Sequence, residues 1–268
     1  MDLVVVTENF CARSGLVSEW GFSVWLQGTD GVVLMDTGGP QHTLMPNMRA
    51  LGLDPGDVSH IVLSHGHYDH VGGLDALLPL VPKAKIWGGR SIMRERRGDA
   101  DARRLNGGVG IVPACEITPV DFSAAIMPGV TAFIVPQEER DQQFIVNRAL
   151  WEVRDGAIVP DMFADDLSLL VQGQNGYSLI VGCAHSGLPN ILACVRGHFH
   201  VDELEYVIGG THLSAFSAEE LERSVEACRI LPVRHWRPAH CTGFPGGVAL
   251  ARHFDDVRWA GAGTRCVL

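Results

Sequence analysis

Short apolar runs recur along the chain and are separated by polar turns, which is the pattern of buried strands. In the first quarter, such runs cover residues 3–6, 22–26, 32–35 and 58–63. Residues 28–31, GTDG, predict a hairpin turn between the second run and the third. The spacing of apolar positions predicts helices over residues 44–51 and 74–78.

The second half repeats this rhythm of strands and helices. Strands are predicted over residues 167–171, 177–181, 204–208 and 233–238, and helices over residues 188–195 and 218–228. Strands that alternate with helices are typical of the α/β class. We therefore predict an α/β fold in which polar residues at the strand ends meet at one edge of a sheet, where such folds keep their active sites.

Length and composition fit one domain. The chain has 268 residues, 46% of them hydrophobic, and no low-complexity linker, so we predict a single domain over residues 1–268. Residues 90–130 are less regular and rich in arginine, and we expect them to form a lid or an insertion. The arginines at positions 90, 94, 96, 97, 103 and 104 would close over an anionic substrate, or else form a solvated face.

Charge and the lack of targeting signals limit the expected partners. The net charge of -10 disfavours binding to nucleic acid, because nucleic-acid-binding proteins normally carry a basic excess. No basic segment precedes the first apolar run, and no apolar run approaches the roughly 18 residues of a membrane span. The seven cysteines form no CxxC pair and are expected to be reduced and mostly buried. We expect a cytoplasmic protein that needs no membrane, and the sequence leaves open whether it forms a homo-oligomer.

Four side chains able to bind metal directly follow the predicted strand at residues 58–63: His65, His67, Asp69 and His70. Imidazole suits zinc and iron, and a carboxylate adds charge, so this cluster can serve two adjacent ions. His65 and His67 point the same way in an extended chain, whereas Asp69 and His70 lie past the bend and face a second ion. The alternative is a histidine-rich surface turn, but the order of ligands after a buried strand favours a catalytic metal site.

Three more histidines follow predicted strands: His185, His212 and His240. Because the strand ends meet at one edge, we expect all three beside the first cluster. His185 and His240 are predicted to bind metal. His212 is predicted to lie in the site without touching metal, where it donates a proton to a leaving group or holds a substrate oxygen.

Four further residues have two interpretations each. Asp36 ends the strand at residues 32–35, and it either orients a metal ligand or caps a turn. Cys183 either places a thiolate between two ions or is a small buried residue at a strand end. Asp165 and Asp166 either supply a carboxylate in place of that thiolate or cap a turn.

Residues 64–73 read SHGHYDHVGG and resemble the HxHxDH motif of the metallo-β-lactamase superfamily, and residues 36–38, DTG, resemble the strand-end motif that precedes it there. The segments around His185, His212 and His240 are similar to the branch that includes archaeal enzymes described as 7,8-dihydropterin-6-methyl-4-(β-D-ribofuranosyl)-aminobenzene-5'-phosphate synthase. The resemblance covers nearly the whole chain. It implies a four-layer αββα sandwich with metals at one edge between two sheets.

The chain departs from the common pattern of that superfamily in two places. No histidine stands shortly before the strand at residues 167–171, so we expect His185 to take over that ligand's role. Residues 182–183, GC, replace the usual glycine-aspartate, so the bridging carboxylate is missing. The expected ligands are His65, His67 and His185 for the first ion and Asp69, His70 and His240 for the second. Zinc is the expected metal, with iron or manganese as alternatives.

These residues lead to the hypothesis of a dinuclear metallo-hydrolase that acts on an ester, lactone, amide or phosphoester of a small anionic substrate. Asp69 would also orient the attacking water, and His212 would serve the leaving group. One alternative is a pterin-type condensing synthase that releases pyrophosphate. The other is a non-catalytic sensor of the same fold that binds a metal or a ligand.

Overall fold

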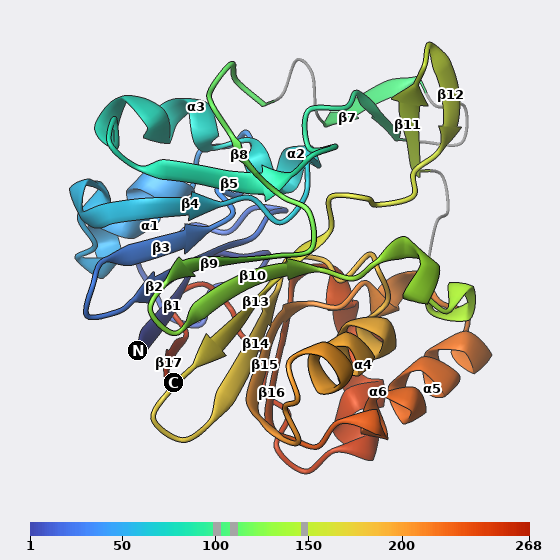
Figure 1. The fold of residues 1–268 in the computed structure, drawn as a ribbon. Coiled ribbons are helices and arrows are strands. Elements are labelled where there is room, and N and C mark those ends of the chain that lie inside the picture. The colour runs from blue at the N-terminus through green and yellow to red at the C-terminus, as the bar shows by residue number, and fades with distance from the viewer. Residues whose placement is uncertain (99–102, 108–111, 146–149) are drawn as a thin grey trace.

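Two large sheets pack face to face in the computed structural model, which describes residues 1–98, 103–107, 112–145 and 150–268 (Figure 1). The first sheet contains, in spatial order, β17 (Arg265–Val267), β1 (Asp2–Thr7), β2 (Ser23–Gln27), β3 (Val32–Met35), β4 (Val58–Val62), β5 (Lys85–Gly89) and β8 (Thr118–Val120). The second contains β16 (Val233–Ala239), β15 (Leu204–Gly210), β14 (Tyr177–Val181), β13 (Leu167–Gln172), β10 (Val130–Ile134) and β9 (Ser123–Met127).

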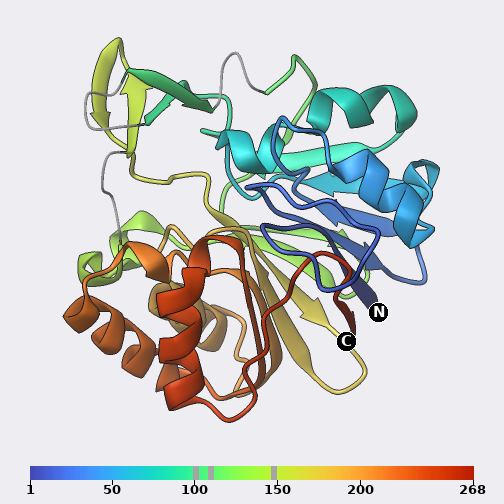
Figure 2. The same cartoon turned by 180° about the vertical axis from the view of Figure 1, so that it is seen from behind.

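A third, small sheet projects beyond the two large ones, as the opposite views in Figures 1 and 2 show. Its strands are, in order, β12 (Ala157–Pro160), β11 (Leu150–Arg154), β6 (Arg96–Gly98) and β7 (Arg104–Gly107). The chain enters this sheet after β5 and again before β13. The small sheet is therefore made from two separate insertions between strands of the large sheets.

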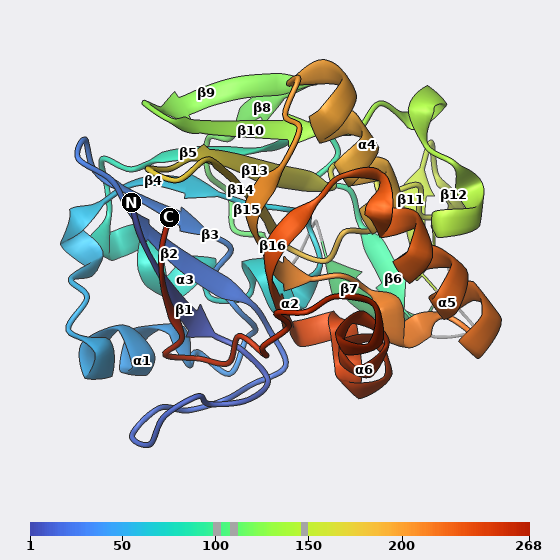
Figure 3. The same cartoon turned by 90° about the horizontal axis from the view of Figure 1, so that it is seen from below.

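Helices cover the outer face of each large sheet, which gives the four layers of an αββα sandwich (Figures 1 and 3). The first sheet is covered by α1 (Leu44–Leu51) and α3 (Leu74–Leu77), and the second by α4 (Leu188–His198), α5 (Ala218–Ala227) and α6 (Gly243–His253). A short helix, α2 (Tyr68–Val71), follows β4. Among the described residues, 3₁₀ turns occupy Pro55–Asp57, Leu78–Leu80, Gln137–Glu139, Gln142–Phe144, Leu213–Ala215, Cys228–Ile230 and His240–Thr242.

The alternation of side chains along each strand builds these layers. In β1, Leu3 and Val5 pack in the core between the sheets, whereas Val4 and Val6 pack against the helix layer. Successive side chains of a strand point to opposite faces, so a fully apolar strand contributes to both cores. The predicted α/β class and four-layer sandwich are confirmed.

The predicted strands and helices are confirmed to within three residues, the largest difference being the end of α4. The segment at residues 90–130, expected to be irregular, holds β6, β7, β8 and β9, although residues 99–102 and 108–111 lie outside the described part. β9 pairs with β10 and completes the second large sheet. None of the helices in the described ranges is both long and apolar enough to cross a membrane.

Candidate metal centre

The candidate site lies where the carboxyl ends of the central strands of both sheets meet. β3, β4 and β5 run parallel in the first sheet, and β14, β15 and β16 run parallel in the second, so each set ends at one edge. The chain after β4 carries the first four candidate ligands, and the chain after β14, β15 and β16 carries the remaining ones. These residues are His65, His67, Asp69, His70, Cys183, His185, His212 and His240.

Among the groups of three metal-capable side chains that the described residues form at this edge, two contain no cysteine. Nitrogen atoms of His65, His67 and His185 lie within 4.8 Å of one another, and the three side chains are at most 5% exposed. A carboxylate oxygen of Asp69 and nitrogens of His70 and His240 meet the same distance limit. We refer to them as the first triad and the second triad. The structure thus brings together the two sets of residues that the sequence assigned to two ions.

The nitrogen atoms of these histidines fit a cation. Buried polar atoms normally have a hydrogen-bond partner. Within the described residues, however, Nε2 of His65, both ring nitrogens of His185, and Nε2 of His240 have none. Burial and the neighbouring histidines hold the pKa of His65 and of His185 well below the ordinary value, so both rings are neutral at neutral pH. A neutral imidazole with an unpaired nitrogen is the form that binds a divalent ion.

Asp36 fixes the orientation of one histidine from each triad. Its Oδ2 accepts a hydrogen bond from Nδ1 of His70 at 2.6 Å and another from Oγ of Ser64 at 2.7 Å. Because the Ser64 hydroxyl donates its proton to Asp36, it accepts from Nδ1 of His65, which lies 2.9 Å away. Both histidines therefore carry a proton on Nδ1 and keep Nε2 for an ion. Asp36 is thus hydrogen-bonded to a candidate ligand, as its predicted orienting role requires.

Two N-terminal residues orient His240. Nδ1 of this histidine lies 2.9 Å from Oδ1 of Asn9, and its backbone N–H donates to Oε1 of Glu8 at 2.5 Å. Its Nε2 then faces Oδ2 of Asp69 at 3.3 Å. Burial alone would raise the pKa of Asp69, but the contacts with His240 and His70 bring it below the ordinary value, so the carboxylate is ionised.

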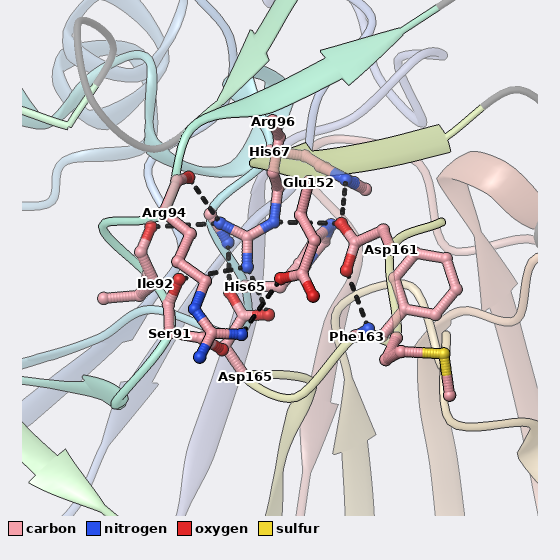
Figure 4. A network of polar contacts seen from close by, with 12 residues as sticks. His65, His67, Ser91, Ile92, Arg94, Arg96, Glu152, Asp161, Phe163 and Asp165 are labelled. Atoms are coloured by element: carbon pink, nitrogen blue, oxygen red, sulfur yellow. Dashed lines mark hydrogen bonds and ion pairs between the residues drawn. The ribbon is translucent and has the colours of Figure 1, made fainter. Parts of the chain in front are cut away.

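A buried arginine and a carboxylate support His67, as Figure 4 shows. Oδ2 of Asp161 lies 3.6 Å from Nε2 of His67, which is an electrostatic contact longer than a hydrogen bond, and 3.1 Å from Nε of Arg96. Burial raises the pKa of Asp161, but His67 and Arg96 lower it to about 2. A carboxylate on the outer nitrogen of a metal-binding histidine fixes the ring and raises its basicity.

The turn at Asp161 also supports His185. Oδ1 of Asp161 accepts a hydrogen bond from the backbone N–H of Phe163 at 2.7 Å, and Phe163 takes a left-handed conformation with φ 49°. Its ring stacks on the His185 ring, with centroids 4.3 Å apart and planes 9° apart. Arg140 donates to the carbonyl oxygens of Met162 and Phe163 and thereby fixes the turn. This one turn therefore contacts two of the three histidines of the first triad.

Asp165 and Asp166 do not supply a carboxylate to the triads. Asp165 accepts from the backbone N–H of Gly66 at 2.8 Å and pairs with Arg96 at 2.6 Å, and Asp166 accepts from the backbone N–H of Ser186 at 2.7 Å. Neither belongs to a group of metal-capable side chains among the described residues. Of their two predicted roles, the one as a metal-bridging carboxylate is wrong, because both carboxylates hold the backbone beside the ligands.

Most of the arginines predicted to cover an anion bind carboxylates of the protein instead. Arg96 is 1% exposed and paired with Asp161 and Asp165. Side-chain ion pairs join Arg90 to Asp121, Arg94 to Glu152, and Arg97 to Glu95. Arg104 differs because it is exposed and lines the cavity at the triads. The arginine best placed to meet an anion is therefore Arg104 rather than Arg96 or Arg97.

A cavity of about 210 Å³ opens on the two triads. Its walls include His67, Asp69, His185, His212 and His240, together with Trp20, Tyr68 and Arg104. The His212 ring lies 4.5 Å from that of His185, and the backbone N–H of His212 donates to Sγ of Cys241 at 3.2 Å. A larger cavity of about 520 Å³, around Phe122 and Arg140, contains none of the triad residues.

Asp161→Asn is expected to weaken binding of the first ion by about ten- to a hundredfold, since loss of an outer partner of a ligand has effects of this size. The amide keeps the shape of the side chain but removes the charge beside His67. Isothermal titration of the metal-free protein with zinc measures the change. Asp155→Asn, in the exposed turn between β11 and β12, is the matched control and should bind zinc as the wild type does. Equal affinities for Asp161→Asn and the control would exclude this role.

Comparison with known proteins gives matches over most of the chain. A family model described as the metallo-beta-lactamase superfamily matches residues 21–189, which include the HxHxDH segment and His185. The 7,8-dihydropterin-6-methyl-4-(beta-D-ribofuranosyl)-aminobenzene-5'-phosphate synthase of Methanocaldococcus jannaschii is 24% identical over 236 residues, or 84% of this chain and 80% of that one. An uncharacterized protein of the same organism is 28% identical over 252 residues, or 90% and 91% of the two chains.

A solved structure also matches the whole fold. Tm1679, described as a metal-dependent hydrolase of the beta-lactamase superfamily, is 27% identical, and the match covers 100% of this chain and 99% of that one. The TM-score of this match is 0.83. The two structures thus share the αββα sandwich over their full lengths.

Proposed function

Because this chain belongs to the metallo-beta-lactamase superfamily, as its sequence motif predicts, we propose that it is a metal-dependent hydrolase of a small anionic substrate. The bond cleaved is that of an ester, lactone, amide or phosphoester. The observation that carries this proposal is the pair of buried triads beside one cavity, with nitrogens of His65, His185 and His240 that have no hydrogen-bond partner among the described residues. The description of Tm1679 as a metal-dependent hydrolase supports it.

We propose zinc as the metal, with iron and manganese as the alternatives. Imidazole and carboxylate ligands bind all three, and zinc takes such ligands with four-coordinate geometry. When bound, divalent ions there would polarise the bond that breaks and acidify water. In this proposal, His65, His67 and His185 hold the first ion, and Asp69, His70 and His240 hold the second.

The side chains of the cavity would supply the remaining steps. Asp69 is ionised and lies at the wall of the cavity, so it orients the attacking water by accepting a hydrogen bond from it. His212 lies at the same wall beside His185 and donates a proton to the leaving group. Arg104, whose guanidinium is 6.0 Å from the centre of the Tyr68 ring, binds the anionic part of the substrate.

Arg104→Gln is expected to raise KM for anionic substrates by about tenfold or more, with a smaller effect on kcat, because it removes a charge-assisted hydrogen bond made throughout the reaction. Neutral analogues should be hardly affected. Steady-state kinetics on matched charged and neutral substrates measure this. Arg97→Gln is the control, because Arg97 is paired with Glu95 and does not line the cavity. An equal change in KM for charged and neutral substrates would show that Arg104 does not bind the anion.

The proposed function is tested by metal content and hydrolysis together. The protein is reconstituted with zinc, dialysed, and assayed on nitrophenyl esters and phosphodiesters. We expect about two ions per chain and metal-dependent hydrolysis. One ion or none per chain would contradict the dinuclear site, and two ions without hydrolysis of any probe would favour a sensor that binds metal.

The second candidate function is a condensing synthase, which the match to the archaeal synthase favours. In that reaction, ions held by the triads would bind a pyrophosphate leaving group. Release of inorganic pyrophosphate from a pterin that carries this group, only when an aromatic amine is present, would identify the synthase. Release without the amine would identify hydrolysis.

A further inference from the structure

Cys183 occupies the space between the two triads. It follows β14 and is 3% exposed, and its Sγ lies 3.1 Å from Nε2 of His70, a member of the second triad. The same sulfur lies within 4.8 Å of a ring nitrogen of His65, a member of the first triad. It also meets this limit with His185 and with His240. One thiol is thus close to ligands of both proposed ions.

No carboxylate competes with this sulfur for the position among the described residues. Asp36 binds Ser64 and Nδ1 of His70, on the side of that ring away from Cys183. Asp165 and Asp166 bind backbone N–H groups. The potential ligand groups that include Cys183 contain histidines and Cys241 but no carboxylate. Among the side chains of the described residues, the Cys183 thiol is therefore the one that lies close to ligands of both triads.

We propose that the Cys183 thiolate is the ligand shared by the two ions, an inference that rests on the proposed binding of metal by the triads. On binding, the S–H bond breaks, its proton goes to solvent, and the sulfur lone pairs form bonds to both ions. A thiolate is a soft ligand, so this shell favours zinc over manganese, which prefers oxygen ligands.

Cys241 is the neighbouring thiol, and its contacts give it a different role. Its Sγ accepts a hydrogen bond from the backbone N–H of His212 at 3.2 Å, and it lies 3.8 Å from the carbonyl oxygen of Cys183. These contacts tie Cys241 to the chain after β15 and after β14. Cys183, in contrast, directs its sulfur to His70. Cys241 is therefore a positioning residue, and Cys183 is the ligand.

Cobalt substitution tests the assignment, because a thiolate bound to Co²⁺ gives a sulfur-to-metal charge-transfer band in the near ultraviolet. The whole metal-free protein is titrated with Co²⁺, and both bound metal and this band are measured. We expect two ions and the band in the wild type. The band should persist in Cys241→Ser and in Cys194→Ser, whose buried thiol on α4 is the matched control. It should disappear in Cys183→Ser, with affinity for one ion at least about tenfold weaker.

Cys183→Asp provides a second variant if the serine variant fails to fold. A carboxylate at this position should restore binding of two ions without the band, and it should reduce the preference for zinc over manganese. Two Co²⁺ ions bound to the wild type without the band would overturn the role of Cys183 and leave the proposed metal site standing. Absence of Co²⁺ binding would overturn both. A Cys183–Cys241 disulfide would also overturn the thiolate assignment. It would lower the mass of the protein by about two units, and the lower mass would persist after Co²⁺ is added under reducing conditions.

Discussion

His67→Ala should remove the first ion and with it nearly all hydrolysis. Its ring is 5% exposed and contributes one of three nitrogens, so the truncated triad would leave two ligands and a buried hole. Loss of a residue that only supports a ligand weakens metal binding by up to about a hundredfold. His67 is itself a proposed ligand, so we expect affinity for this ion to fall by more than that. Elemental analysis after dialysis should show about one ion less per chain than in the wild type.

A matched histidine shows that the effect is local. His198→Ala removes an exposed ring at the end of α4 that pairs with Glu139 and does not line the cavity at the triads. Exposed pairs of this kind contribute about 1 kcal/mol or less to stability, so metal content and turnover should stay at wild-type levels. If His67→Ala keeps the wild-type metal content and turnover, the two triads are not the catalytic centre.

Asp36→Asn should weaken both ions at once. The carboxylate is fully buried, it accepts from His70 directly, and it acts on His65 through Ser64. Asp36 has φ 60°, a left-handed conformation that asparagine also adopts, so the backbone is preserved. Breaking a buried charged contact costs about 3–5 kcal/mol, and we expect a large fall in Tm of the metal-free protein.

Zinc titration and thermal unfolding of Asp36→Asn measure these two effects. Both binding steps should weaken by at least about tenfold, because one histidine of each triad loses its orientation. Asp54→Asn is the control, since Asp54 is exposed and accepts from the N–H of Gly56, which an asparagine side chain can replace. Weakening of only one binding step would show that the relay through Ser64 does not orient His65.

Most of the site was predictable because its ligands follow strands whose apolar runs are long and continuous. His65, His185 and His240 each come shortly after such a run, so their convergence follows from the direction of the strands. Apart from Asp36, the supporting residues were not predictable. Asn9 reaches His240 across 231 positions, and Asp161 reaches His67 from the segment after β12, contacts that no local pattern encodes.

Two of the elements missed in the sequence, β6 and β8, share a physical cause. β6 reads Arg-Arg-Gly and β8 reads Thr-Pro-Val, so both are too short and too polar to give an apolar run. β8 is an edge strand of the first sheet, and β6 belongs to the small sheet, where less surface is buried. The arginines of the predicted lid were misjudged for a related reason, because the carboxylates that bind Arg96 are supplied by the later insertion.

Because Asp161 contacts both Arg96 and His67, folding of the small sheet and ion binding at the first triad are thermodynamically coupled. If the folded small sheet makes the free energy of ion binding more favourable, then a bound ion must raise the free energy of local unfolding of that sheet by the same amount. Sequence changes in β6 or β11 can therefore tune metal affinity without touching a ligand. The projecting sheet is in this sense a site where evolution could adjust metal occupancy while the chemistry stays fixed.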